Sequence, residues 1–394
     1  MSEWKKVKLG EICGRLTSGG TPKANVSSYY NPPTIPWLKT KEVNYCRITE
    51  TENYISEEGL KNSSAKLISP NSVIIAMYGQ GDTAGRVAIN KIPLATNQAC
   101  CNLTIDKSKA DYEFIYYQLC TLYDKLVSLK AGAAQPNLNA RIIKNLEIIM
   151  PSLPIQHRIA TILSRYDSLI ENYQKQIKLL EEAAQRLYKE WFIDLRFPGH
   201  ENTNIIDGVP EGWEKKKLHE IAEVVMGSSP KSEFYNNDKQ GLPFHQGVGS
   251  YGTRFVDDNV YSTSITRLAE PNSILFSVRA PVGRLNITKN KIIIGRGLAA
   301  MNHKDGFQSF LFYMLKERFF MDNIIGNGSI FASISKVELL DQEFIVPPMK
   351  TIKAFESLAS KLDKKIQGVD TQLRLLTEAR DRLLPKLMSG EITV

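Results

Sequence analysis

Hydrophobic residues recur at alternating intervals of three and four in two segments of this 394-residue chain. In the first segment these positions are Leu163, Tyr166, Ile170, Tyr173, Ile177, Leu180, Ala184, Leu187 and Trp191. In the second they are Ala359, Leu362, Ile366, Val369, Leu373, Leu376, Arg380, Leu383 and Leu387. Four heptads of this spacing predict the apolar seam of a coiled coil. Arg380 is expected to extend its charge to solvent, and Gly368 to weaken its helical turn locally.

Each predicted helix begins after prolines, Pro151 and Pro154 in the first case and Pro347 and Pro348 in the second. Prolines are well tolerated at the start of a helix. A helix of about 35–40 residues is roughly 50–60 Å long, which exceeds the diameter of one small domain. One alternative is that each helix packs on its own domain as ordinary core. We instead expect the two helices to pair antiparallel and to relate two globular modules by a pseudo-two-fold axis.

The regions before each helix have a different pattern. Short apolar runs at 73–77, 292–294 and 343–346 lie between clusters of Gly, Pro and Asn. This pattern indicates mixed, strand-rich α/β modules. We therefore expect an α+β protein with globular domains at 1–150 and 212–346, a linker at 198–211, and long helices within 151–197 and 347–394.

The two halves of the chain are copies of one another. Trp4-Lys5-Lys6-Val7-Lys8-Leu9 returns as Trp213-Glu214-Lys215-Lys216-Lys217-Leu218, and Pro70-Asn71-Ser72-Val73 returns as Pro271-Asn272-Ser273-Ile274. From Phe114 onward the copies stay 196 residues apart without a gap, so that Glu147-Ile148-Ile149-Met150-Pro151 matches Glu343-Phe344-Ile345-Val346-Pro347. Chance similarity does not keep register over such a length. The chain is an internal duplication.

Composition narrows the function only slightly. The formal net charge of +8 favours a polyanionic partner. Five cysteines, none in a CxxC spacing, are expected to be reduced, and neither they nor the five histidines form a metal-ligand pattern. The longest apolar stretches, such as Val73-Ile74-Ile75-Ala76-Met77, are far shorter than the roughly 20 residues that a membrane span needs. The sequence Met1-Ser2-Glu3-Trp4-Lys5-Lys6 is not followed by the apolar segment of a signal peptide. We expect a cytoplasmic protein that binds no metal.

We find no catalytic constellation. Asn31-Pro32-Pro33 resembles the start of an amino-methyltransferase motif, but Thr34 stands where an aromatic residue is required. The glycines of Gly79-Gln80-Gly81-Asp82-Thr83-Ala84-Gly85 and of Gly295-Arg296-Gly297 lack the spacing of phosphate or dinucleotide loops. Loops are the better interpretation of these segments.

Several stretches resemble the specificity subunits of type I restriction–modification enzymes. They are Ser18-Gly19-Gly20-Thr21-Pro22-Lys23, Ile35-Pro36-Trp37-Leu38-Lys39-Thr40, Thr96-Asn97-Gln98, Gln135-Pro136-Asn137-Leu138, Pro154-Ile155-Gln156-His157-Arg158-Ile159, Val209-Pro210-Glu211-Gly212-Trp213 and Leu384-Pro385-Lys386-Leu387-Met388-Ser389-Gly390-Glu391-Ile392. In the second copy Ser228-Ser229-Pro230 and Gly295-Arg296-Gly297 depart from the pattern, as expected of a domain that reads different bases.

The resemblance implies two target-recognition domains on duplex DNA, each reading one half of an interrupted sequence, and helices that act as a ruler and dock two modification subunits. It also implies that this chain is not an enzyme and binds no cofactor itself. S-adenosylmethionine for adenine methylation would be bound by the modification subunits, and ATP and Mg would be bound by partner subunits, including restriction subunits that translocate and cleave DNA.

Polar and basic residues in the duplicated loops are the candidates for DNA contact, because Arg and Lys recognise guanine and Asn and Gln recognise adenine. They are Lys23, Gln80, Arg86, Asn97 and Gln98 in the first copy and Lys231, His245, Gln246, Arg279, Arg284 and Arg296 in the second. Arg86 and Arg284 are aligned, which favours a shared phosphate contact. Arg279 and Arg296 have no counterpart and are better candidates for base specificity.

Two other classes of function compete with this one. A coiled-coil adaptor whose heads bind protein would show no salt-dependent affinity for DNA. A self-sufficient methyltransferase would transfer a methyl group without a partner, and the missing donor loop argues against it.

Overall fold

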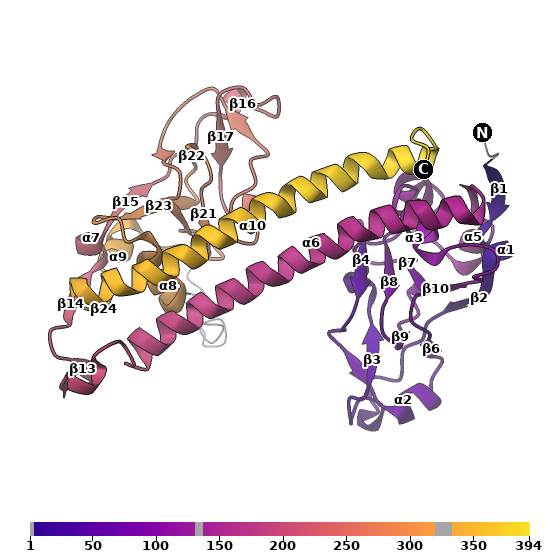
Figure 1. Cartoon of the computed structure of the whole chain (residues 1–394), viewed down its shortest axis with the longest axis horizontal. Helices are drawn as coiled ribbons and strands as arrows, with labels where there is room; N and C mark the ends of the chain where they lie inside the picture. The colour runs from indigo at the N-terminus through magenta and orange to yellow at the C-terminus, as the bar shows by residue number, and fades with distance from the viewer. Residues whose placement is uncertain (1–3, 131–136, 320–332) are drawn as a thin grey trace. The chain divides into compact units, whose positions relative to one another are not determined.

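The computed structural model describes residues 4–130, 137–319 and 333–394. These residues form two compact units (Figure 1). Unit 1 comprises Met1–Asn172 and Gln372–Val394, and unit 2 comprises Tyr173–Thr371. Each unit therefore combines one globular module with one part of each long helix. Two residues of the family-like stretch, Gln135 and Pro136, lie outside the described residues.

The module of unit 1 is built on a five-stranded sheet with the strand order β2-β10-β7-β8-β4. Its strands are β2 (Cys13–Ser18), β4 (Cys46–Ile48), β7 (Val73–Ala76), β8 (Val87–Asn90) and β10 (Cys100–Ile105). β7 and β8 are buried along their whole length, which explains why their sequences are nearly unbroken apolar runs. β4 pairs parallel with β8, whereas the other pairs are antiparallel.

A second sheet in unit 1 has the order β5-β3-β9-β6, and Figure 1 shows it farther from helix α6 than the first sheet. Its strands are β3 (Ile35–Leu38), β5 (Tyr54–Ile55), β6 (Leu67–Ile68) and β9 (Leu94–Thr96). A separate pair joins β1 (Lys5–Lys8) to β11 (Glu147–Met150). The short helices are α1 (Leu9–Ile12), α2 (Glu57–Lys61), α3 (Tyr112–Cys120), α4 (Tyr123–Ser128) and α5 (Ala140–Lys144).

Unit 2 repeats this design. Its first sheet has the order β15-β23-β20-β21, its second has the order β16-β18-β17-β22-β19, and β14 pairs with β24. The strands are β14 (Glu214–Lys217), β15 (Ala222–Met226), β16 (Tyr235–Asn236), β17 (Leu242–His245), β18 (Tyr261–Ser262), β19 (Leu268–Ala269), β20 (Ile274–Ser277), β21 (Leu285–Ile287), β22 (Ile292–Ile294), β23 (Leu298–His303) and β24 (Glu343–Val346). The short helices are α7 (Leu218–Ile221), α8 (Gln308–Phe319) and α9 (Lys336–Leu340).

The repeat extends to backbone detail. Asn71 and Asn272, aligned in the sequence, adopt left-handed φ angles of 66° and 65° at the turns before β7 and β20. Asparagine tolerates this region better than most residues. In the second sheets the central strands, β3 with β9 and β17 with β22, pair parallel in both units. The prediction of duplicated mixed α/β modules is confirmed.

Two long helices accompany the modules, α6 (Leu153–Tyr188) with 36 residues and α10 (Met349–Ser389) with 41. Every residue assigned to the seam is buried or half-buried, whereas neighbours such as Leu169, Leu179 and Leu375 are 44–53% exposed. The heptad pattern therefore marks the faces that the helices bury.

The two helices run antiparallel within each unit. In unit 1, Leu163 of α6 and Leu387 of α10 share one core, and Asp167 of α6 pairs with Arg380 of α10 at 2.8 Å. Residue numbers therefore rise along α6 where those of its partners on α10 fall. In unit 2, Tyr188 and Phe355 pack edge to face with ring centroids 5.8 Å apart. The expectation that Arg380 extends to solvent is wrong, because its guanidinium is held by Asp167 across the seam.

The segment after α6 departs from the predicted long helix. α6 ends at Tyr188, and a π-helical turn, Lys189–Ile193, follows before the short helix His200–Asn202 and the hairpin β12 (Ile205–Ile206) and β13 (Val209–Pro210). Trp191, the last seam residue, lies in the π turn and packs on Phe355. Trp191 and Phe192, both in this turn, belong to the core of unit 2.

All five cysteines are free, and Cys100 and Cys101 are buried. Within the described ranges, no helix is long and apolar enough to cross a membrane. The same residues contain no group of three or more His, Cys, Asp or Glu side chains that could hold a metal ion.

Candidate nucleic-acid interface

Two loops meet beside the second sheet of unit 1. The first follows β2 and carries Lys23, and the second joins β9 to β10 and carries Asn97 and Gln98. The backbone N–H of Gly19 donates to the carbonyl of Cys100 at 3.1 Å, and that of Gly20 donates to Thr96 at 2.8 Å. A Cβ atom on Gly19 would overlap the carbonyl oxygen of Asn97. Only glycine permits so close an approach of the two loops.

Unit 2 has the same loop frame. The N–H of Gly227, at the end of β15, donates to Leu298 at 2.9 Å, and that of Ser228 donates to Ile294 at 2.9 Å. A Cβ on Gly227 would overlap the carbonyl oxygen of Gly295, as at the corresponding Gly19. We call these pairs of loops, residues 19–23 with 97–98 and residues 227–231 with 295–297, the recognition loops. In both units, backbone hydrogen bonds and a glycine fix the part of these loops that lies next to the sheet.

The side chains at the tips of the recognition loops differ between the units. In unit 1 Lys23 and Gln98 are exposed and Asn97 is half-buried. The Thr21 hydroxyl donates to the Oε1 atom of Gln98. This bond holds one end of the amide, and the amide nitrogen remains a donor for an external acceptor.

In unit 2 the tips carry Lys231 and Arg296, both exposed. Gln246, which follows β17, is also exposed, and its Oε1 atom accepts a hydrogen bond from the Ser229 hydroxyl at 2.7 Å. The backbone N–H of Arg296 donates to the same hydroxyl at 3.1 Å. Thr21 and Ser229 were absent from the candidate residues. Their alignment next to Pro22 and Pro230 is the signal that could have identified them.

A second group of candidates lies in the hairpin loops of the first sheets. Gln80 is exposed between β7 and β8, where a loop was predicted and is confirmed. Arg86 is half-buried and forms an ion pair with Asp82 at 2.6 Å and a hydrogen bond with Asn44 at 3.0 Å. The hydrogen bond from Arg86 lowers the pKa of Asp82. Asp82 and Asn44 fix the orientation of the Arg86 guanidinium, and the Asp82 carboxylate offsets part of its charge. The phosphate contact of Arg86 stays a prediction.

The corresponding loop of unit 2 carries Arg279 and Arg284. Arg279 is exposed and its backbone bridges Ser333, whereas Arg284 is half-buried. The loop lies between β20 and β21, the equivalents of β7 and β8. Arg279 and Arg284 thus belong to a loop distinct from the recognition loops that carry Lys231 and Arg296.

His245 is a correction to the sequence analysis. Its side chain is only 1% exposed, with Nε2 2.9 Å from Asp258 and Nδ1 2.8 Å from the Ser250 hydroxyl. Both ring nitrogens are therefore occupied, and the residue has almost no surface to offer a ligand. It supports the base of the loop that carries its neighbour Gln246.

The family described as type I restriction modification DNA specificity domain matches residues 1–182 and 210–373. The MjaIX specificity subunit of Methanocaldococcus jannaschii, a type I restriction enzyme component, is 31% identical over 100% of this chain and 94% of its own length. The EcoR124I/EcoR124II specificity subunit of Escherichia coli is 29% identical over half of the chain. A crystal structure of the S subunit of a type I restriction–modification system from M. genitalium superimposes with a TM-score of 0.65 at 18% identity, covering 98% of this chain and 96% of that one.

Proposed function

Because this chain belongs to the type I restriction–modification DNA specificity family, we propose that each unit reads one half of an interrupted DNA sequence and that the helices dock two modification subunits. Members of this family are the specificity components of type I enzymes. The present chain would select the sequence, and its partners would carry out the chemistry.

One observation carries the proposal for two half-sites. The recognition loops are held to the sheets in the same way in both units, but the side chains at their tips differ. Gly19 and Gly227 allow the two loops of each pair to approach closely next to the sheet. The tips present Asn97 and Gln98 in one unit and Arg296 in the other, where Gln246 of a neighbouring loop accepts a hydrogen bond from Ser229. Amides pair well with adenine and guanidinium pairs with guanine. A shared frame with exchanged donors is what reading two different base sequences requires.

A repeated surface on the helices supports the docking of two identical partners. Six residues of the segment Leu179–Leu187 recur unchanged 196 residues later. Two of them, Leu180 and Leu187, belong to the seam. The other four and their counterparts, which we call the repeated stripe, are Leu179, Glu182, Ala183 and Arg186 in α6 and Leu375, Glu378, Ala379 and Arg382 in α10.

The stripe residues are spaced at i, i+3, i+4 and i+7, so that in each helix they lie on one face. All are exposed except Glu378, which is half-buried, and both leucines are 53% exposed. Packing within the chain explains identity at seam positions but not at exposed ones. Two copies of one partner, each contacting one stripe, would require the same exposed residues on both stripes.

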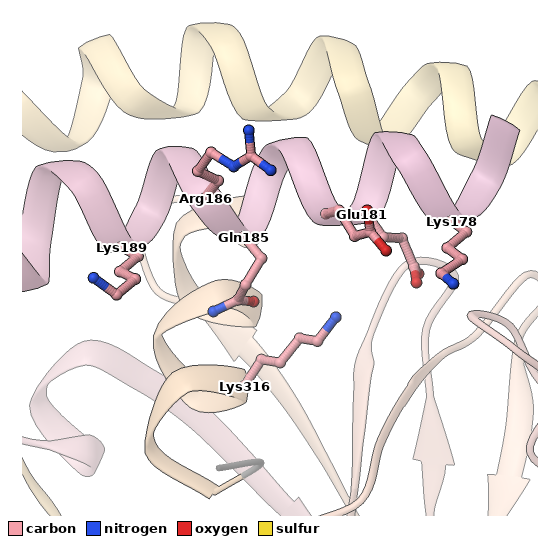
Figure 2. A pocket seen from close by; sticks show the side chains of 7 residues that line it. Lys178, Glu181, Gln185, Arg186, Lys189 and Lys316 are labelled. Carbon is pink, nitrogen blue, oxygen red and sulfur yellow. The ribbon is translucent and has the colours of Figure 1, made fainter. Parts of the chain in front are cut away.

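The surroundings of the stripe in unit 2 are strongly polar. Glu182 and Arg186 line a pocket with Lys178, Glu181, Gln185, Lys189 and Lys316. Figure 2 shows the side chains of Lys178, Arg186 and Lys189 on α6 and of Lys316 on α8. Burial lowers the pKa of Lys316, so that an acidic group placed there would stabilise its charged form. A partner helix with one leucine-binding face and acidic flanks would fit this surface.

In this proposal the chain holds no cofactor of its own. The modification subunits would bind S-adenosylmethionine and methylate adenine, and restriction subunits, where present, would use ATP and Mg²⁺. Duplex DNA is the ligand shared by all of them.

The proposal is tested by exchanging one module. Residues 1–150 are replaced by the equivalent segment of a relative, and methylated adenines are mapped in cells that express the modification subunit. One half-site should change while the other stays. The matched control exchanges residues 212–346 and should change only the opposite half. If both half-sites change together, the two-headed assignment is wrong, and if the wild-type chain shows no salt-dependent DNA binding, the adaptor function replaces it.

A further inference from the structure

A buried arginine joins the module of unit 2 to both long helices. Arg254 is only 2% exposed, and its guanidinium lies 2.6 Å from the carboxylate of Asp363 in α10 and 3.7 Å from that of Glu181 in α6. The Tyr313 hydroxyl donates to the same Asp363 oxygen at 2.8 Å. The guanidinium also stacks 3.7 Å from the ring centre of Phe312.

Unit 1 has a matching arrangement around Arg47 of β4. The guanidinium donates to the Ser168 hydroxyl at 2.9 Å and to the Ser164 carbonyl at 3.0 Å, both in α6. It lies 4.0 Å from Asp167 and 3.6 Å from Glu171. All of these groups are on one helix face, so that Arg47 binds a single patch of α6.

The helix carboxylate in unit 1 has further partners. The Tyr117 hydroxyl donates to Asp167 at 2.5 Å, and Arg380 of α10 donates to its other oxygen at 2.8 Å. Burial raises the pKa of the Tyr117 and Tyr313 hydroxyls. Both therefore stay protonated and act as donors.

The two arrangements are the same device. Asp363 and Tyr313 each lie 196 residues after Asp167 and Tyr117. The arginines come from the same segment of each fold, one residue apart in register. Arg47 of β4 pairs parallel with β8, and Phe255, which follows Arg254, pairs parallel with β21. We call each set of arginine, tyrosine and aspartate an anchor.

An anchor constrains the angle of the module on its helix more than it stabilises the fold. A buried ion pair is often no more stable than apolar residues of the same volume, because desolvation offsets the attraction. The hydrogen bonds that the arginines do donate, from Arg254 to Asp363 and from Arg47 to Ser164 and Ser168, are directional and keep their geometry at only one orientation of the module on the helix. Apolar surfaces alone tolerate small rotations and shifts.

We propose that Arg47 and Arg254 are positioning residues that hold each recognition module at one angle on its helices and thereby fix the spacer length between the two half-sites. This inference rests on the proposed function. It assigns the anchors no contact with DNA and no part in reading bases.

The test uses the full chain with its modification subunits and maps methylated adenines in the genome. In Arg254→Met the half-site sequences should stay the same, while methylation spreads to spacers one base pair shorter or longer. The preference for the native spacer should fall by about tenfold or more, within the range of coupling between contacting groups. Arg254→Lys, which keeps the charge but not the planar fork, should give an intermediate preference.

Because Arg254→Met leaves Asp363 unpaired, a second variant, Arg254→Met with Asp363→Leu, removes both charges and keeps the volume. It should fold and show the same broadened spacer. A single native spacer at native preference in the folded double variant would overturn the inference. Altered half-site bases would overturn it too, because they would place Arg254 in recognition. Failure of the proposed function is distinguishable, since the wild-type chain would then produce no two-part methylation pattern.

Discussion

The length of the two helices should set the number of base pairs between the half-sites. The perturbation is a heptad inserted in each helix where the chain passes from one unit to the other, a copy of Tyr173–Leu179 after Asn172 and a copy of Gln372–Glu378 after Thr371. Both copies continue the alternation of three and four, so that the seam keeps its register. No module or anchor residue changes.

Seven residues add about 10 Å of helix and rotate the far end by about 20°. Duplex DNA rises about 3.4 Å per base pair. The spacer should therefore lengthen by at most about three base pairs, and by fewer if the helices cross the duplex obliquely. The half-site sequences should not change, because the recognition loops are untouched.

Genomic methylation mapping measures both the half-site sequences and the spacer. A two-residue insertion at the same points is the control, since it turns the following seam residues by about 200° and should abolish assembly. An active heptad variant that still methylates only the original spacer would show that modification subunits, and not these helices, hold the modules apart.

Three further predictions concern single residues. Leu376→Asp places a charge in the seam and should lower the free energy of unfolding by about 2 kcal/mol or more, measured by thermal denaturation; Leu375→Asp, at a neighbouring site that is 53% exposed, should leave unfolding unchanged and weaken only modification-subunit binding. Arg296→Ala should relax one base position by about 1–3 kcal/mol, whereas Arg86→Ala should weaken all sequences equally and reduce the salt slope by about one; titrations of labelled duplexes at several salt concentrations separate the two, and equal loss on every sequence with Arg296→Ala would contradict a base contact. Burial alone would raise the pKa of Asp258, but hydrogen bonds from His245 and Asn290 bring this pKa below its usual value. The resulting stabilisation of the fold is complete above the unfolded pKa of about 3.9 and is lost as the pH falls through the lower folded pKa. Asp258→Asn should therefore lower the free energy of unfolding near neutral pH and much less in strong acid, and a loss independent of pH would refute the assignment.

The duplication and the seam could be predicted because they are written as fixed intervals in the sequence. A residue such as Leu163 faces a helix partner by virtue of its period alone. The recognition loops were also identifiable in outline, since Gly19 and Lys23 belong to a stretch with a counterpart before Lys231. Periodicity and repetition are local properties, and they survive without knowledge of distant contacts.

The anchors could not be predicted in the same way. Arg47 lies 120 residues from Asp167, and Arg254 lies 109 residues from Asp363. The loops around the two arginines differ in length, so that no constant offset aligns them. The aspartate of each anchor was nevertheless identifiable in the sequence, because Asp167 and Asp363 are identical polar residues beside the seam in a segment aligned without gaps.

Burial explains the other errors. The sequence favours His245 by its residue type next to Gln246, but the fold brings Asp258 within 2.9 Å of its Nε2 atom. In the sequence Arg380 is an isolated exception in the seam, whereas in the fold the opposite helix supplies the carboxylate of Asp167. In both cases a polar side chain that looks unsatisfied in the sequence is paired by a residue from another segment of the fold.

The composition of unit 1 from two separate segments has a consequence for protein synthesis. Its core includes Leu387 and Met388 beside Leu163, and the ribosome makes Gln372 two hundred residues after Asn172. At about 5–20 residues per second, the first unit waits roughly 10–40 s for its closing helix, while unit 2 emerges complete. During that interval the apolar face of α6 has no native cover and is a natural target for chaperones. A translation product that stops before residue 372 lacks Leu387 and Met388 and leaves this part of the unit 1 core uncovered.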